Sequence, residues 1–339
     1  MFGIFISILS SNLFLVWLGL EINMFGIIPF MLLNNREVND NEINVGIYYF
    51  LVQVLGSMLF AWGSILGNFS ILGVMGLCIK LGVPPFFWWV PSVFNRLDWF
   101  SIILMSTVQK VPLIILIRLA FDLSLWLSLL ICFLGLVISA IGINFSNNQI
   151  KLLMAWSSIG NMSLFFCLFN FYFNMAIIYF VCYSISVFGV GLILFKNGVN
   201  LLDSNSENGI NIDLLLNVSL AVLIFSGLPP LLGFISKIYL FSGLSVSEGD
   251  LMIKQIEVMD NNNYMVEYPI YKDLGGWSVS LILSGLLILQ VVAYIKVFIN
   301  IYGSFFTNLE SSSRSTSLSW NIDYFLLLIL ISSGVILMI

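Results

Sequence analysis

The sequence predicts an all-α, polytopic membrane protein whose helices are interrupted by prolines. Of its 339 residues, 60% are hydrophobic and 9% are charged, whereas a water-soluble domain is about 25% charged. Apolar stretches of about 20 residues recur along the whole chain, and each is long enough to cross about 30 Å of hydrocarbon. Some of these stretches carry a lysine beside a Pro-Pro pair. The chain is therefore built to hold ionisable groups inside a membrane.

The spans follow from hydropathy and from helix-breaking residues. Residues 2–9 are apolar but too short to cross the bilayer, and we interpret them as the stub of a first helix. The first full span, 11–33, ends at the polar segment 34–42. Nine further spans are predicted, at 44–67, 70–95, 99–119, 123–144, 149–168, 173–195, 214–243, 277–302 and 321–339.

Two proline breaks indicate an internal repeat. Counting the stub as helix one, Gly82-Val-Pro-Pro85 lies in helix four and Gly227-Leu-Pro-Pro230 lies in helix nine. Each break takes the fourth position of a five-helix unit, and because five is odd, the second unit enters the membrane inverted. Paired broken helices in inverted halves are typical of a transport path. The prediction is one transmembrane domain, 1–339, with two inverted five-helix repeats and a C-terminal loop and helix, at 2–122, 123–302 (which includes a polar loop, 244–276) and 303–339.

Four ionisable residues inside the predicted spans are the candidates for chemistry: Glu21, Lys80, Lys110 and Lys237. A charge at bilayer depth costs about 2.5–3.5 kcal/mol on insertion scales, so such residues mark functional sites by default. A buried carboxylate can exchange a proton or pair with a lysine, and a buried lysine can hold or release a proton according to its partner. The alternative for Glu21 is a structural salt bridge or a helix-end group, and for the lysines it is snorkelling to the interface.

Prolines accompany these lysines. Proline removes a backbone donor and frees a carbonyl, and polar backbone at membrane depth is tolerated only when it is buried in protein or lines a hydrated cavity. Lys151 lies close to a helix start, where snorkelling explains it equally well, so it is only a further candidate for a proton relay. The predicted helix breaks are at Pro84, Pro85, Pro112, Pro229 and Pro230.

Composition argues against several functional classes. The chain has no histidine, which removes the commonest metal ligand, the usual haem ligand and the usual proton shuttle near neutral pH. Its four cysteines are isolated within apolar runs, so neither a metal site nor a disulfide framework is expected. No phosphate-binding motif occurs. We expect this chain to bind no metal, cofactor or nucleic acid and to contain no redox centre.

Five motifs occur in order between about residue 10 and residue 302: Trp17-Leu-Gly-Leu-Glu-Ile-Asn-Met24, Lys80-Leu-Gly-Val-Pro-Pro-Phe86 with Trp89-Val-Pro91, Gln109-Lys110, Ser157-Ser-Ile159, and Gly227-Leu-Pro-Pro230 with Gly233-Phe-Ile-Ser-Lys237. Each motif is weak alone, but five in register are specific. They resemble the motifs of the NADH–ubiquinone oxidoreductase chain 2 family in its mitochondrially encoded animal form. Members of this family are antiporter-like membrane-arm subunits of respiratory complex I.

The resemblance implies an antiporter-like fold and a proton-translocating subunit in the mitochondrial inner membrane, driven by quinone reduction elsewhere in the complex. NADH, FMN, iron–sulfur clusters and ubiquinone would be bound by other subunits. The implied partners are neighbouring antiporter-like subunits, accessory subunits of the membrane arm, and lipids. By the family pattern, Glu21 and Lys80 would be the coupled ion pair and Lys110 the central relay lysine. Lys237 would lie toward the exit side, and Lys151 matches a further basic position.

The chain departs from the family pattern at several points. The first helix is only a stub, and the 244–276 loop is longer than usual. Phe87 and Asn161 stand where relatives often have histidine, and Ser92 stands where they often have glutamate. These changes leave the lysine relay intact, but they argue against a path that depends on those groups.

Two other functions fit the same residues. One is a cation/proton antiporter subunit, which shares the fold and the lysine relay. The other is a structural role, in which the relay is silent and the chain joins neighbouring subunits. Replacement of Lys80 or Lys110 by methionine tests the structural role, because unchanged proton pumping and coupled turnover would mean that the replaced lysine is not part of a relay.

Overall fold

The computed structural model describes residues 2–10, 12–34, 45–65, 71–120, 125–146, 149–171, 173–197, 222–227, 237 and 276–311. All regular secondary structure in these ranges is helical. The predicted 321–339 span, the 244–276 loop and most of the 214–243 span lie outside the described ranges. Among the described residues, five helical segments are long and apolar enough to cross a membrane: Val45–Ser64, Trp126–Asn144, Ile150–Phe169, Phe173–Phe195 and Ile282–Asn300. The multi-pass prediction is thus confirmed.

The first half of the chain follows the predicted order of elements. The predicted stub is an eight-residue helix, α1, and the first full span is a 22-residue helix, α2. The predicted spans at 70–95 and 99–119 are each divided, as their prolines indicate. The bounds are α1 Phe2–Leu9, α2 Leu13–Asn34, α3 Val45–Ile65, α4 Ile71–Leu81, α5 Trp89–Arg96, α6 Trp99–Ser106, the 3-10 turn η1 Val108–Lys110, and α7 Val111–Ala120.

The second half contains longer, uninterrupted helices: α8 Leu125–Asn144, α9 Ile150–Phe171, α10 Phe173–Asn197 and α13 Gly276–Ser311. The prediction of a loop beginning at residue 303 is wrong, because α13 continues to Ser311. Residues 303–311 are more polar than the span before them but contain no proline. Hydropathy therefore marked the end of the apolar segment, while the helix continues beyond it.

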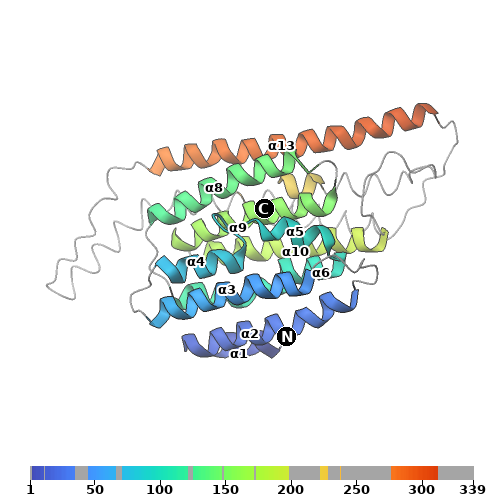
Figure 1. The fold of residues 1–339 in the computed structure, drawn as a ribbon. Helices are drawn as coiled ribbons and strands as arrows, with labels where there is room; N and C mark the ends of the chain where they lie inside the picture. Colours follow the sequence, from blue (N-terminus) through green and yellow to red (C-terminus); the bar gives the residue numbers. More distant parts are fainter. Residues whose placement is uncertain are drawn as a thin grey trace.

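The helices run side by side, with α1 and α2 at one edge of the bundle and α13 at the other (Figure 1). Helix α13 packs on α8, and α8 packs extensively on α9. Helix α9 is the most enclosed of the long helices, since 83% of its apolar window is buried. It also contacts α5 and α10. Ser157, Ser158 and Asn161 are consequently buried inside the bundle rather than exposed to lipid.

A left-handed glycine stands at each proline break. Gly82 has φ +71° directly after α4, and both its N–H and that of Val83 donate to the Cys78 carbonyl, at 3.0 Å each. Gly227 has φ +68° at the end of the helical residues 222–226, and its N–H donates to the Ile224 carbonyl at 3.3 Å. Only glycine adopts this conformation without a steric cost. Gly82 and Gly227 thus share a left-handed φ two positions before the first proline of each pair, while the inverted repeat itself stays a prediction.

Candidate functional site

Lys80 and Glu21 form an ion pair inside the bundle. The Lys80 Nζ donates to the Glu21 Oε1 at 3.0 Å, and the two side chains are 4% and 13% exposed. Glu21 lies in the middle of α2, and Lys80 lies in the last turn of α4. Their mutual attraction and hydrogen bond offset the desolvation of two charges, which neither group could bear alone at this depth.

The chain positions Lys80 through a helix end and a close helix contact. Pro84 and Pro85 have no N–H to continue the ladder of α4, so the helix ends inside the membrane and its last carbonyls favour a nearby cation. The indole of Trp89, the first residue of α5, donates to the Ile79 carbonyl at 3.0 Å. Gly56 of α3 has no Cβ, and a Cβ there would lie 3.0 Å from the Lys80 Cγ. The lysine stem therefore packs directly on α3.

Lys110 also lies at an interrupted helix. Helix α6 ends at Ser106, and the turn η1 is closed by a bond from the Lys110 N–H to the Thr107 carbonyl at 3.1 Å. Pro112 lies in the first turn of α7, where its missing N–H is tolerated. The Lys110 side chain is buried, and its Nζ lies 5.7 Å from the centre of the Tyr183 ring. In the described part of the chain, no carboxylate lies within ion-pair distance of this Nζ.

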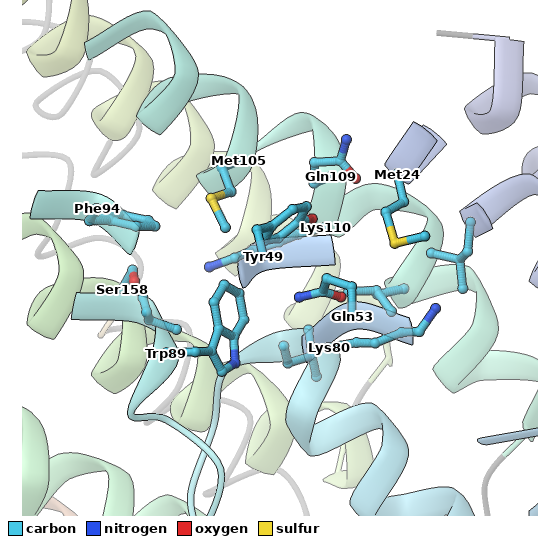
Figure 2. Close-up of a pocket in the computed structure, with 14 residues that line it drawn as sticks. Met24, Tyr49, Gln53, Lys80, Trp89, Phe94, Met105, Gln109, Lys110 and Ser158 are labelled. Carbon is cyan, nitrogen blue, oxygen red and sulfur yellow. The ribbon is translucent and has the colours of Figure 1, made fainter. Parts of the chain in front are cut away.

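The two lysines line one cavity (Figure 2). Its volume is about 30 Å³, which is room for about two water molecules, since one needs about 10–15 Å³. In the view of Figure 2 the Gln53 amide lies between Lys110 and Lys80. The cavity is further lined by Leu20, Met24, Tyr49, Leu81, Trp89, Val90, Phe94, Met105, Gln109, Leu113 and Ser158. The cavity thus connects a lysine that is paired with a carboxylate and a lysine that has no carboxylate partner in the described ranges.

Lys237 has a different partner. It is 7% exposed, and its Nζ donates to the backbone carbonyl of Ser226 at 2.6 Å. In a continuous helix the Ser226 carbonyl would accept a hydrogen bond from the backbone N–H of the residue four positions later, or three positions later in a 3-10 turn. Those residues are Pro230 and Pro229. Neither proline has an N–H. The proline pair therefore leaves free the carbonyl that holds Lys237.

The structure does not bring Lys151 into the cavity. Lys151 is the second residue of α9, is half-buried, and its Nζ lies 5.8 Å from the centre of the Trp99 ring. A lysine at a helix start over an aromatic ring is the arrangement expected for a group near the membrane boundary. Its part in a relay stays a prediction.

Further polar residues belong to the site. Gln109 stands beside Lys110 in one of the sequence motifs, whereas no role was predicted for the Asn23 amide, Gln53 or Tyr183. Asn23 and Gln109 bond reciprocally: the Asn23 Nδ2 donates to the Gln109 Oε1 at 3.2 Å, and the Gln109 Nε2 donates to the Asn23 carbonyl at 3.0 Å. Gln53 and Tyr183 lie in spans that read as ordinary apolar helices. A glutamine inside an apolar span was the one available signal for Gln53. Nothing in the sequence marked Tyr183 as a neighbour of Lys110.

A second buried polar group lies between α9 and α13. Within the described part of the chain, the Gln290 Oε1 and the Tyr294 hydroxyl have no hydrogen-bond partner that meets the usual distance and angle, and both residues are 1% exposed. The Tyr294 hydroxyl lies beside that of Ser157, which donates to the Met154 carbonyl at 2.8 Å. Tyr294 is also close enough to Tyr183 to interact electrostatically. Buried polar groups therefore continue from Lys110 toward α13.

Metal ligands do not gather anywhere in the described ranges: no group of three or more His, Cys, Asp or Glu side chains occurs there. The cysteines at 78, 132, 167 and 182 are buried and free. The expectation that this chain binds no metal or cofactor remains a prediction.

Sequence comparisons identify a known family of membrane proteins. Residues 61–257 match the family model described as "NADH:quinone oxidoreductase/Mrp antiporter, TM". NADH-ubiquinone oxidoreductase chain 2 of Artemia franciscana is 31% identical over 240 residues, which cover 70% of this chain and 76% of the relative. The corresponding chain of Crocidura hildegardeae is 27% identical over 270 residues, which cover 74% of this chain and 76% of the relative.

Solved structures share the fold. A chain of respiratory complex I from Thermus thermophilus with bound aureothin superposes with a TM-score of 0.70 at 17% identity, covering 99% of this chain and 74% of that chain. A chain of the Mrp complex from Dietzia sp. DQ12-45-1b superposes with a TM-score of 0.65 at 15% identity, covering 87% and 57%. Both bear out the antiporter-like fold.

Proposed function

Because the chain belongs to the family of NADH:quinone oxidoreductase and Mrp antiporter membrane subunits, we propose that it is a proton-translocating membrane-arm subunit of an NADH:ubiquinone oxidoreductase. In this proposal it works in the mitochondrial inner membrane beside other antiporter-like and accessory subunits. Quinone reduction elsewhere in the complex drives it, and the redox cofactors belong to other subunits. The names of its relatives support this assignment.

The observation that carries the proposal is the shared cavity of Lys80 and Lys110, with Glu21 bonded to Lys80. A lysine held by a carboxylate stays protonated, and a buried lysine without a partner favours the neutral amine. Opening the Glu21–Lys80 pair would therefore release a proton from the Lys80 Nζ. Water in the cavity can carry that proton to the Lys110 amine. No histidine is needed for such a step.

Lys237 extends the path in the second half of the chain. Among the described residues, the Lys237 ammonium donates to one neutral acceptor, the Ser226 carbonyl. A cation held by one carbonyl can exchange that bond for water more readily than a cation held by a carboxylate. We assign Lys237 to the exit side of the path, with Lys151 as a peripheral candidate.

A cation/proton antiporter subunit is the second candidate. The likeness to the Mrp complex chain and the family description both favour it, because they include antiporters. The relay residues would be the same, and the driving partner would differ. The relatives named as NADH-ubiquinone oxidoreductase chain 2 weigh toward the first candidate.

Native electrophoresis of mildly solubilised membranes separates the two candidates. The gel is stained for NADH dehydrogenase activity, and peptides are identified in the stained band. We expect this chain in the large NADH-oxidising band. Its presence in a different band without NADH activity, together with sodium/proton exchange in vesicles, would establish the antiporter instead.

A further inference from the structure

The reciprocal amide pair Asn23–Gln109 joins two segments that carry relay residues. Asn23 follows Glu21 by two positions in α2, and Gln109 directly precedes Lys110 in η1. The pair spans 86 positions of sequence with two hydrogen bonds of 3.2 and 3.0 Å. Asn23 is 6% exposed, and Gln109 lines the cavity that Lys80 and Lys110 share. The two bonds therefore lie inside the site.

Helix α2 forms hydrogen bonds to two different segments through two residues that are two positions apart. Residues two positions apart in an α-helix point about 200° from one another, since each residue turns by about 100°. Glu21 accordingly bonds to Lys80 of α4, while Asn23 bonds to Gln109 of η1. Helix α2 thus contacts the end of α4 and the turn that carries Lys110 through different sides of the helix.

The turn itself is poorly held by its own backbone. It is three residues long, and 3-10 hydrogen bonds have poorer geometry than those of an α-helix. Relaxation of three residues from 3-10 to α geometry would rotate the Lys110 side chain by about 60° and move it by about 1.5 Å along the axis. Proton transfer needs heavy atoms within about 2.6–3.2 Å or one bridging water. A shift of that size would interrupt a path through the cavity.

We propose that Asn23 and Gln109 are positioning residues, which hold the 3-10 turn against α2 so that the Lys110 amine stays in the cavity it shares with Lys80. The inference rests on the proposed function, because it assigns the pair a role in the proton path. Neither amide carries the proton. Their work is to keep the distance between the ion pair and Lys110 constant while the ion pair opens and closes.

A double-mutant cycle in the intact complex separates positioning from simple packing. Asn23→Leu leaves the Gln109 Oε1 unpaired, and Gln109→Met leaves the Asn23 Nδ2 unpaired, so each single variant should lower the amount of assembled complex. The double variant has no unpaired amide and should recover assembly. It still lacks the tie between α2 and η1. We therefore expect the double variant to assemble and to pump at most about half as many protons per electron as the wild type.

Protons per electron are measured in vesicles, from the quenching of a pH-sensitive dye divided by the rate of NADH oxidation. If the double variant recovers both assembly and the proton-to-electron ratio, the Asn23–Gln109 pair serves packing only, and the proposal is overturned. Asn144→Leu is the matched control, because its Nδ2 donates to the Ala140 carbonyl within α8, away from the cavity. It should leave the ratio unchanged.

Gln109→Asn is a second variant that tests the proposal if the double variant fails to assemble. It keeps the amide and shortens its reach by one methylene, so it should assemble and lower the ratio. An unchanged ratio in Gln109→Asn would also overturn the proposal. Lys110→Met, measured in parallel, tests the proposed function on its own. If Lys110→Met pumps normally, the relay is wrong; if only Lys110→Met loses pumping, the positioning role alone is wrong.

Discussion

The Nζ of Lys80 lies 3.0 Å from the Oε1 of Glu21, although 59 positions of sequence separate the two residues. Lys110 lines the same cavity as Lys80; within the described ranges its Nζ has no carboxylate partner and lies 5.7 Å from the centre of the Tyr183 ring. The site therefore contains one lysine with a carboxylate partner and one without. The following predictions depend on that difference.

Lys80→Met should impair both assembly and pumping. Removal of one partner of a buried ion pair leaves the other charge uncompensated and destabilises by about 3–5 kcal/mol. The double variant Glu21→Gln with Lys80→Met removes both charges and should assemble better than Lys80→Met alone, while pumping stays lost. Native gels measure assembly, and dye quenching in vesicles measures pumping. Equal assembly of the single and double variants would argue against a stabilising pair.

Lys110→Met should abolish pumping without harming assembly. The ammonium has no carboxylate partner in the described ranges, so its removal leaves no buried charge behind. Loss of a proton-transferring group lowers rates by about 100-fold or more, and coupled turnover should fall on the order of tenfold at least. Lys296→Met is the matched control, because Lys296 is exposed on α13. Normal coupled turnover in Lys110→Met would exclude it from the relay.

Proton pumping should depend more on the aromatic ring of Tyr183 than on its hydroxyl group. A cation over an aromatic face is stabilised by about 0.5–2 kcal/mol, and the Lys110 Nζ lies 5.7 Å from the ring centre. Tyr183→Phe keeps the ring and should retain pumping, whereas Tyr183→Leu should reduce it several-fold. Steady-state proton pumping in vesicles compares the two. If Phe and Leu behave alike, the ring is not what holds Lys110.

Pro230→Ala should weaken the contact between Lys237 and Ser226. The substitution returns an N–H to the position four residues after the Ser226 carbonyl, where it competes with the Lys237 ammonium. A neutral hydrogen bond of about 1 kcal/mol changes the occupancy of that contact roughly fivefold. We expect fewer pumped protons per electron. Pro29→Ala, inside α2, replaces a proline remote from any relay lysine and should leave the ratio unchanged.

Gly82→Ala should destabilise the first broken helix. The left-handed φ of +71° costs a side chain about 1–2 kcal/mol, and the new Cβ would also overlap the Val90 side chain. The thermal midpoint of the assembled complex should fall. Gly26→Ala is the control, because no atom lies within 4 Å of its Cβ position, and it should be neutral or stabilising by about 0.5–1 kcal/mol. A lowered midpoint in both variants would mean that the φ of Gly82 is not the cause.

Local sequence signals predicted the helices and their breaks well. The apolar length of each span, and the prolines at 84, 85 and 112, are properties of neighbouring residues, and the helices end or tighten where those residues stand. The end of α13 was missed for the same reason. Residues 303–311 have no signal to stop a helix, although their polarity suggested a loop.

The same reasoning identified Lys80, Lys110, Lys237 and Glu21, since a charge in an apolar run is conspicuous in any sequence. It did not identify the amide of Asn23 or the ring of Tyr183. Amides and tyrosines are common in membrane helices, and their meaning depends on what lies across the helix interface. Lys151 was included as a lysine close to a helix start that matches a further basic position of the family, and it lies over Trp99 instead of in the cavity.

The sequence by itself determined the class of the protein, the helices, the broken helices and the buried ionisable groups, because these follow from hydropathy and backbone chemistry over a few turns. Only the tertiary structure decided which groups meet. It paired Lys80 with Glu21, left Lys110 over an aromatic ring, and joined Asn23 to Gln109. Such contacts depend on how whole helices pack, through close approaches such as that of Gly56 to the Lys80 stem. Contacts between residues that are 59 or 86 positions apart cannot be predicted from the sequence around either residue.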